Sequence, residues 1–108
     1  MTWEQKCQLL FEESDGVKFD ARVKRLKRAG SRAQLIDLLS SYVVQGQLLH
    51  WRGFLCADLA EMAEPTDAAL GDRFATWLTS DHGADVHYWA VLGLVRVRGR
   101  AAEPTLVA

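Results

Sequence analysis

The residues best suited to chemistry lie just after residue 80, where two histidines alternate with two aspartates. Asp81, His82, Asp85 and His87 are residue types that bind metal ions. Their spacing matches no standard zinc site, and the chain contains no HExxH motif. Asp81 and Asp85 are more typical of a turn residue and a helix cap. We therefore expect no metal at this segment.

Other catalytic signatures are missing from the sequence. It contains no GxSxG elbow, Walker loop or GxGxxG motif. Asp58, Glu61 and Glu64 recur every three residues, a pattern typical of a solvated helix face. Cys7 and Cys56 show no CxxC spacing, which favours two free thiols in a reducing compartment, with a disulfide as the alternative. The sequence therefore predicts a protein that is not an enzyme and binds no cofactor.

Composition is that of one folded domain. The chain has 108 residues, of which 49% are hydrophobic and 25% charged. The net charge of -1 excludes attraction of the whole molecule to nucleic acid or to an anionic membrane. No apolar run approaches the roughly 20 residues that span a bilayer, and the first residues do not form a signal peptide. We expect a cytoplasmic protein with no membrane partner.

Local charge is concentrated between residues 18 and 28, which hold six basic residues. Lys18, Arg22 and Arg25 follow at helical spacing and share one face. Such a stripe is suited to nucleic-acid phosphates or to an acidic protein partner. The plainer interpretation is a solvated helix face, partly neutralised by neighbouring acidic residues.

Glycine and proline divide the chain into segments that each read as a helix. Capping boxes at Thr2/Gln5 and Ser31/Gln34 mark two helix starts. We expect Thr66 or Asp67, and then Asp85, to cap two later helices. The expected helices are 3–13, 17–29, 31–46, 48–63, 67–79, 86–97 and a last one from 101.

The segment 91–97 also fits a strand. It is rich in β-branched residues, and apolar and basic residues alternate from Val95 to Arg98. Trp89, Gly93 and Val97 lie on one face of a helix, however. We predict a helix, with a strand as the alternative.

An internal repeat supports a helical array. Residues 49–56 align with residues 86–93 at an offset of 37, and residues 26–35 resemble residues 97–106. Around Gly30, a helix ends in a small-residue turn and a second helix follows with a ladder of leucines, which resembles the HEAT-like repeat family. The resemblance implies an all-α fold: a short right-handed α-solenoid of antiparallel helix pairs, with about six helices. The single domain, residues 1–108, would then comprise a capping helix at 1–15 and helix-pair units at 16–46, 47–80 and 81–108, the last incomplete.

The same resemblance suggests a function. Short helical arrays commonly bind a macromolecule on their concave face, and in this family the second helix of each pair lines that face. We therefore expect a non-catalytic protein-binding module, such as a small adaptor or a toxin-neutralising immunity protein. Nucleic-acid binding through the basic stripe is the alternative, and a homodimer through the incomplete C-terminal end is a further option. The expected partner contacts are Gln34, Asp37, Ser41, Asp72, Arg73 and Thr76.

Overall fold

The computed structural model describes residues 1–107, and they are helical with no β-strand among them. Six α-helices of ten or more residues are followed by a short 3-10 helix and a last α-helix. The prediction of an all-α chain is therefore confirmed. The helices are α1 (Trp3–Glu12), α2 (Gly16–Ala29), α3 (Arg32–Gln45), α4 (Leu49–Met62), α5 (Ala68–Leu78), α6 (Ala84–Arg98), η1 (Gly99–Ala102) and α7 (Glu103–Val107).

Local hydrogen bonds explain where the first helices begin. Both predicted capping boxes are present, with Thr2 and Gln5 bonded reciprocally at α1 and Ser31 and Gln34 at α3. At α2, the side chain of Asp15 accepts a hydrogen bond from the backbone of residue 18 at 3.1 Å. These bonds satisfy backbone N–H groups that the first turn of a helix leaves without partners.

The predicted cap of α6 is wrong. Helix α6 begins at Ala84, and its N-cap is Gly83, whose φ of 100° favours glycine over other residues. Asp85 lies in the first turn instead, where its carboxylate is favourably placed toward the positive end of the helix dipole.

Residues 91–97 form helix, so the alternative of a strand is wrong. They belong to α6, in which Val86, Ala90, Gly93, Leu94 and Val97 are buried. This spacing of four, three, one and three residues presents a single helical face to the core. The tertiary contacts of that face outweigh the preference of the β-branched residues for strands.

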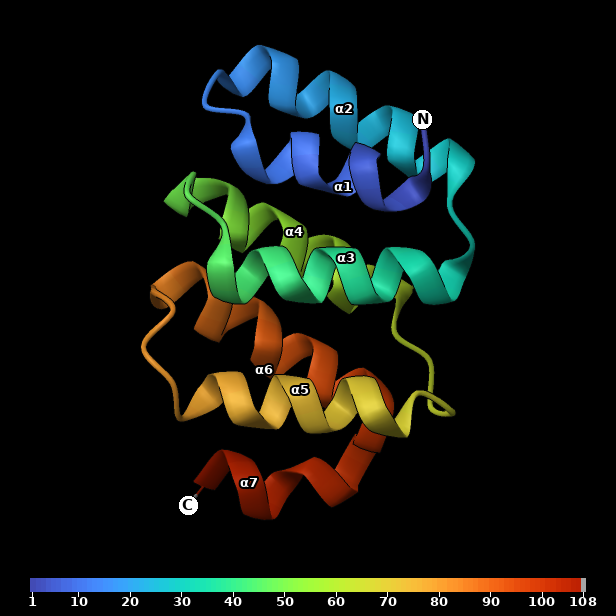
Figure 1. The fold of residues 1–108 in the computed structure, drawn as a ribbon. Helices are drawn as coiled ribbons and strands as arrows, with labels where there is room; N and C mark the ends of the chain where they lie inside the picture. Colours follow the sequence, from blue (N-terminus) through green and yellow to red (C-terminus); the bar gives the residue numbers. More distant parts are fainter. Residues whose placement is uncertain (108) are drawn as a thin grey trace.

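The helix pairs α1/α2, α3/α4 and α5/α6 follow one another in chain order along a body measuring 43 × 26 × 17 Å (Figure 1). Helices α1, α3 and α5 form one layer, and α2, α4 and α6 lie behind them. The most extensive packing joins α4 with α6, α5 with α6, and α3 with α4. The α3–α4 and α5–α6 contacts thus cross the boundaries of the units expected at 16–46, 47–80 and 81–108.

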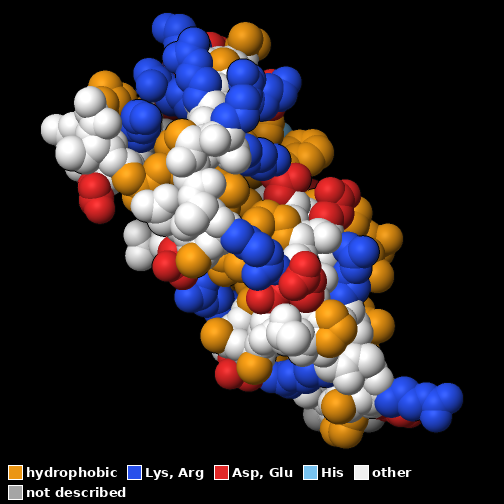
Figure 2. Space-filling model, turned by 90° about the vertical axis from the view of Figure 1, so that its right-hand side faces the viewer, with side chains coloured by type: hydrophobic (Ala, Val, Ile, Leu, Met, Phe, Trp, Pro, Cys, Tyr) orange, Lys and Arg blue, Asp and Glu red, His pale blue; other side chains and the backbone are white. Residues whose placement is uncertain are grey.

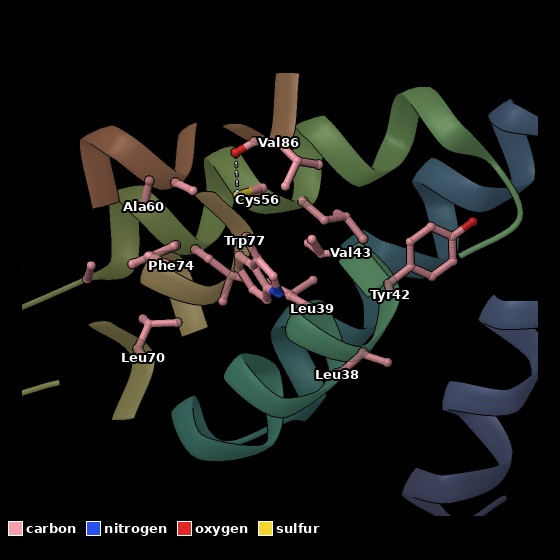
Figure 3. Close-up of a cluster of buried hydrophobic side chains, with 14 of the residues drawn as sticks. Leu38, Leu39, Tyr42, Val43, Cys56, Ala60, Leu70, Phe74, Trp77 and Val86 are labelled. Carbon is pink, nitrogen blue, oxygen red and sulfur yellow. Dashed lines mark hydrogen bonds between the residues drawn. The ribbon is translucent and has the colours of Figure 1, made fainter. Parts of the chain in front are cut away.

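The buried hydrophobic residues form one cluster that includes residues of every helix from α1 to α6, and Figure 3 shows part of it. Near its N-terminal end, the ring of Tyr42 lies 5.2 Å from Phe11 and 4.8 Å from Phe19, measured between centroids. Between α5 and α6, a Cβ added to Gly93 would come within 2.4 Å of the Phe74 ring. The absence of a side chain at Gly93 therefore lets these two helices approach closely.

The aligned segments of α4 and α6 agree in burial at some positions and differ at others. At the offset of 37, Gly53 and Cys56 match Ala90 and Gly93, and all four are buried. Leu49 (70% exposed) matches Val86 (1%), however, and Leu55 (0%) matches Leu92 (39%). Similar residue types at aligned positions therefore do not fix which side of each helix is buried.

Candidate protein-binding surface

Two residues of the expected partner face bind each other. On α5, Arg73 donates through Nη2 to Asp37 Oδ1 at 3.0 Å and through Nη1 to Ser40 Oγ at 2.9 Å. Asp37 and Ser40 both belong to α3, so this guanidinium links α3 with α5. These polar groups already have partners within the fold.

Three more of the expected contacts also take part in intramolecular bonds. Asp72 accepts from Arg98 Nη2 at 2.6 Å, and the Thr76 hydroxyl donates to the Asp72 carbonyl at 3.0 Å. Gln34 serves in the capping box of α3. Ser41 is exposed, and no side-chain hydrogen bond of the described residues involves it. Of the six expected residues, the structure brings only Asp37 and Arg73 into direct side-chain contact.

The basic stripe lies on α2, at the end of the molecule where lysines and arginines gather (Figure 2). Half of the six cations of α2 pair with carboxylates: Arg22 with Glu13 at 2.9 Å, Lys24 with Asp20 at 2.8 Å, and Lys27 with Asp58 at 2.8 Å. The hydrogen bond from Arg22 lowers the pKa of Glu13. Among residues 1–107, Lys18, Arg25 and Arg28 form no ion pair.

Of the residues that could support chemistry, Asp81, His82 and Asp85 line one groove with His50. In the described part of the chain, no three His, Cys, Asp or Glu side chains are grouped so as to hold a metal ion. The Cys56 thiol is buried and donates to the Val86 carbonyl at 3.6 Å (Figure 3). Burial raises its pKa to about 12, so this sulfur stays protonated at neutral pH. A protonated, buried thiol is a packing group and a poor nucleophile.

A surface that the sequence analysis did not single out gathers exposed apolar side chains on α4 and α6. We call it the aromatic patch, and it consists of Trp51, Phe54, Tyr88, Trp89, Leu92 and Val95. Phe54 and Tyr88 are each 58% exposed, and Leu92 and Val95 are also exposed. Trp51 and Trp89 are half-buried and line one groove together with Phe54.

Helix geometry and one arginine position this patch. Tyr88, Leu92 and Val95 follow at spacings of four and three on α6, so they share its outer face. Ring centroids lie 5.0 Å apart for Tyr88 and Trp89, and 5.4 Å apart for Trp51 and Phe54. The Arg96 guanidinium holds α6 against α4, donating to the carbonyls of residues 60 and 61 at 3.0 and 3.1 Å.

Phe54 is exposed, although Cys56, two residues further along α4, is buried. Most positions of α4 and α6 are apolar, so periodicity alone does not separate a core-facing stripe from an outward one. The signal in the sequence is the number of large aromatics that these two helices hold: Trp51, Phe54, Tyr88 and Trp89.

Comparisons with known proteins returned no match, whether against protein-family models, curated proteins or solved structures. Within residues 1–107, no helix is both long enough and apolar enough to cross a bilayer.

Proposed function

We propose that this chain is a non-catalytic protein-binding module that uses the aromatic patch on α4 and α6. The observation that carries the proposal is the exposure of Phe54 and Tyr88 beside two half-buried tryptophans. Contiguous apolar surface of this kind on a folded domain typically marks a contact with another macromolecule. An adaptor and a toxin-neutralising immunity protein would both use such a surface.

The composition of the patch suits a folded protein partner. Tryptophan and tyrosine dominate the binding energy of protein interfaces, and they act best at the centre of a patch with a polar rim. Here the rim includes the ion pair between Lys27 and Asp58 and the carboxylate of Glu61, which line the same groove as Trp51 and Phe54. Covering one large apolar side chain contributes about 1.5–3 kcal/mol, which gives a partner a clear gain from this surface.

The proposed architecture remains a short right-handed α-solenoid of HEAT-like helix pairs. Two features support it: the helix pairs follow one another in chain order, and alternate helices lie in the same layer (Figure 1). Each layer of an array buries the apolar faces of its neighbours and leaves an extended surface free for a partner. In this proposal the partner contacts the α4–α6 layer instead of the α3–α5 layer.

The test is a quantitative pull-down from the native source with three versions of the chain. The wild type is compared with a Phe54→Ser/Tyr88→Ser variant and with a Ser41→Arg variant, which probes the α3–α5 layer without breaking an internal bond. All three positions are exposed, so the free energy of unfolding should change little, and circular dichroism with urea denaturation checks this. We expect a stoichiometric partner with the wild type and with Ser41→Arg, and its loss with the double variant.

Two results would overturn the proposal. One is the absence of any stoichiometric partner while sedimentation also shows a monomer over a hundredfold range of concentration. The other is a partner that the double variant retains and Ser41→Arg loses, which would place the site on α3 and α5. A wild type that dimerises while the double variant does not would identify the partner as a second copy of this chain.

A further inference from the structure

A second groove lies at the N-terminal end of the molecule, between α1 and α2 (Figure 1). Its apolar lining includes Leu9 and Leu26, and Met1 lies at its edge. Leu26 is almost fully buried and Leu9 is half-buried, so the floor of the groove belongs to the core and the walls are open to solvent. A trough between two helices with an apolar floor is the shape that a third, amphipathic helix fills.

The rim of this groove is positively charged. Lys6 from α1 and Arg22 and Arg25 from α2 line it. Only Arg22 is paired there, through Nε to Glu13, whereas Lys6 and Arg25 are exposed and form no ion pair within residues 1–107.

The net charge of -1 conceals an uneven distribution of charge along the chain. Helix α2 carries six basic residues and one acidic residue, a net charge of +5, so the remainder of the chain carries -6. A cationic rim attracts an oppositely charged ligand to this end of the molecule and not to the rest.

We propose that the α1–α2 groove binds an acidic amphipathic helix of a partner protein, with leucine-like side chains on the Leu9/Leu26 floor and carboxylates against Lys6 and Arg25. This site is separate from the aromatic patch and does not depend on it.

The apolar floor distinguishes this occupant from nucleic acid. A phosphate backbone would use the cations and leave the apolar surface of Leu9 open to solvent. In addition, three of the six basic residues of α2 are already paired with carboxylates, which reduces the charge available along the helix. An amphipathic helix uses both the cations and the floor.

The experiment measures fluorescence anisotropy of labelled peptides of about 18 residues, long enough to follow the 14-residue α2. One peptide is an amphipathic helix with leucines on one face and glutamates beside them. A second has the same composition in scrambled order, a third carries lysine in place of glutamate, and a single-stranded and a duplex DNA oligonucleotide complete the set. Each is titrated with the wild type, with a Lys6→Glu/Arg25→Glu variant, and with an Arg28→Glu/Arg100→Glu variant, which changes the charge equally at two exposed residues that do not line the groove.

We expect the acidic amphipathic helix to bind more tightly than the scrambled and basic peptides and the oligonucleotides. The groove variant should weaken that binding about tenfold or more, and the control variant by much less. No binding of the acidic helix, equal binding of the scrambled peptide, or equal losses in both double variants would overturn the proposal. Tighter binding of either oligonucleotide would overturn it in favour of a phosphate-binding surface. The Phe54→Ser/Tyr88→Ser variant should bind the peptide with the affinity of the wild type. This result separates the two proposals, because the peptide tests only the α1–α2 groove and the pull-down tests the aromatic patch.

Discussion

Arg32, the first residue of α3, forms a two-pronged ion pair with Asp67, the N-cap of α5. The guanidinium donates from Nη1 to Oδ1 at 2.9 Å and from Nη2 to Oδ2 at 2.6 Å. The same Nη2 reaches the Met62 carbonyl at the end of α4 at 2.7 Å, and Asp67 Oδ2 also accepts from the Glu64 backbone at 2.7 Å. One arginine therefore fastens the turn between α4 and α5 to the start of α3.

Replacing Arg32 with alanine should destabilise the chain by about 1–2 kcal/mol, because a charge-assisted pair and a bond to a helix-end carbonyl are lost together. Arg32→Lys should recover only part of this, since an ammonium cannot make the two-pronged contact. Arg25→Ala is the matched control, and as an exposed arginine without an ion pair it should change stability by less than about 0.5 kcal/mol. Urea denaturation monitored by circular dichroism measures all three. Equal stability of Arg32→Ala and Arg25→Ala would show that the bonds of Arg32 to Asp67 and to the Met62 carbonyl do not stabilise the fold.

Stability should fall in acid because of two carboxylates. The hydrogen bond from Arg32 lowers the pKa of Asp67, and the bond from Arg22 lowers the pKa of Glu13. As pH falls, the unfolded chain takes up protons at these positions before the folded chain does, so their contribution is complete above about pH 5 and is lost as pH falls through the lowered folded values.

The measurement is the urea midpoint at pH 7, 5, 4 and 3 for the wild type and for Glu13→Gln/Asp67→Asn. The double variant should be less stable at pH 7 and should lose less stability between pH 5 and pH 3. If the urea midpoints of the wild type and the double variant fall in parallel as pH is lowered, groups other than Glu13 and Asp67 govern the loss of stability in acid.

Two glycine-to-alanine substitutions in helices should have opposite effects. Gly93→Ala would place a methyl group 2.4 Å from the Phe74 ring between α5 and α6, and overpacking of this kind costs about 1–3 kcal/mol. Gly16→Ala, at the first position of α2, meets its nearest neighbour at 3.8 Å, so it should gain up to about 1 kcal/mol from helix propensity. Thermal or urea unfolding compares the two variants. A stabilised Gly93→Ala would mean that α5 and α6 are not in close contact there.

The two thiols should differ in reactivity in a way that reports on the core. Burial raises the pKa of Cys56 to about 12, so the thiol stays protonated at pH 8, and the side chain is also inaccessible. In Cys7→Ser, which leaves Cys56 alone, an aromatic disulfide reagent at pH 8 should react only after denaturant unfolds the chain. The Cys56→Ala variant reports Cys7, which is half-buried and should react without denaturant, though slowly. Rapid reaction of native Cys7→Ser would place Cys56 outside the core.

The starts of α1 and α3 were determined by the sequence itself. Capping boxes at Thr2/Gln5 and Ser31/Gln34 join residues three positions apart, so neighbouring atoms suffice to form them. The breaks between helices also followed from local information, since Gly30, Gly46 and Pro65 lie where α2, α3 and α4 end. The error at Asp85 is of the same local kind, because a carboxylate one position inside a helix resembles a cap in sequence.

Only the tertiary structure decided which faces are buried and which polar groups are free. Arg32 and Asp67 stand 35 residues apart, as Arg73 and Asp37 stand 36 apart, and no periodic pattern predicts which of many charges will meet. Helix α6 is apolar around most of its circumference, so the packing of α4 and α5 against it determined that Ala90 and Leu94 are buried while Tyr88 and Leu92 face outward. The physical reason is that burial and ion pairing are relations between segments distant in sequence, whereas capping and turn formation depend on atoms within a few residues of one another.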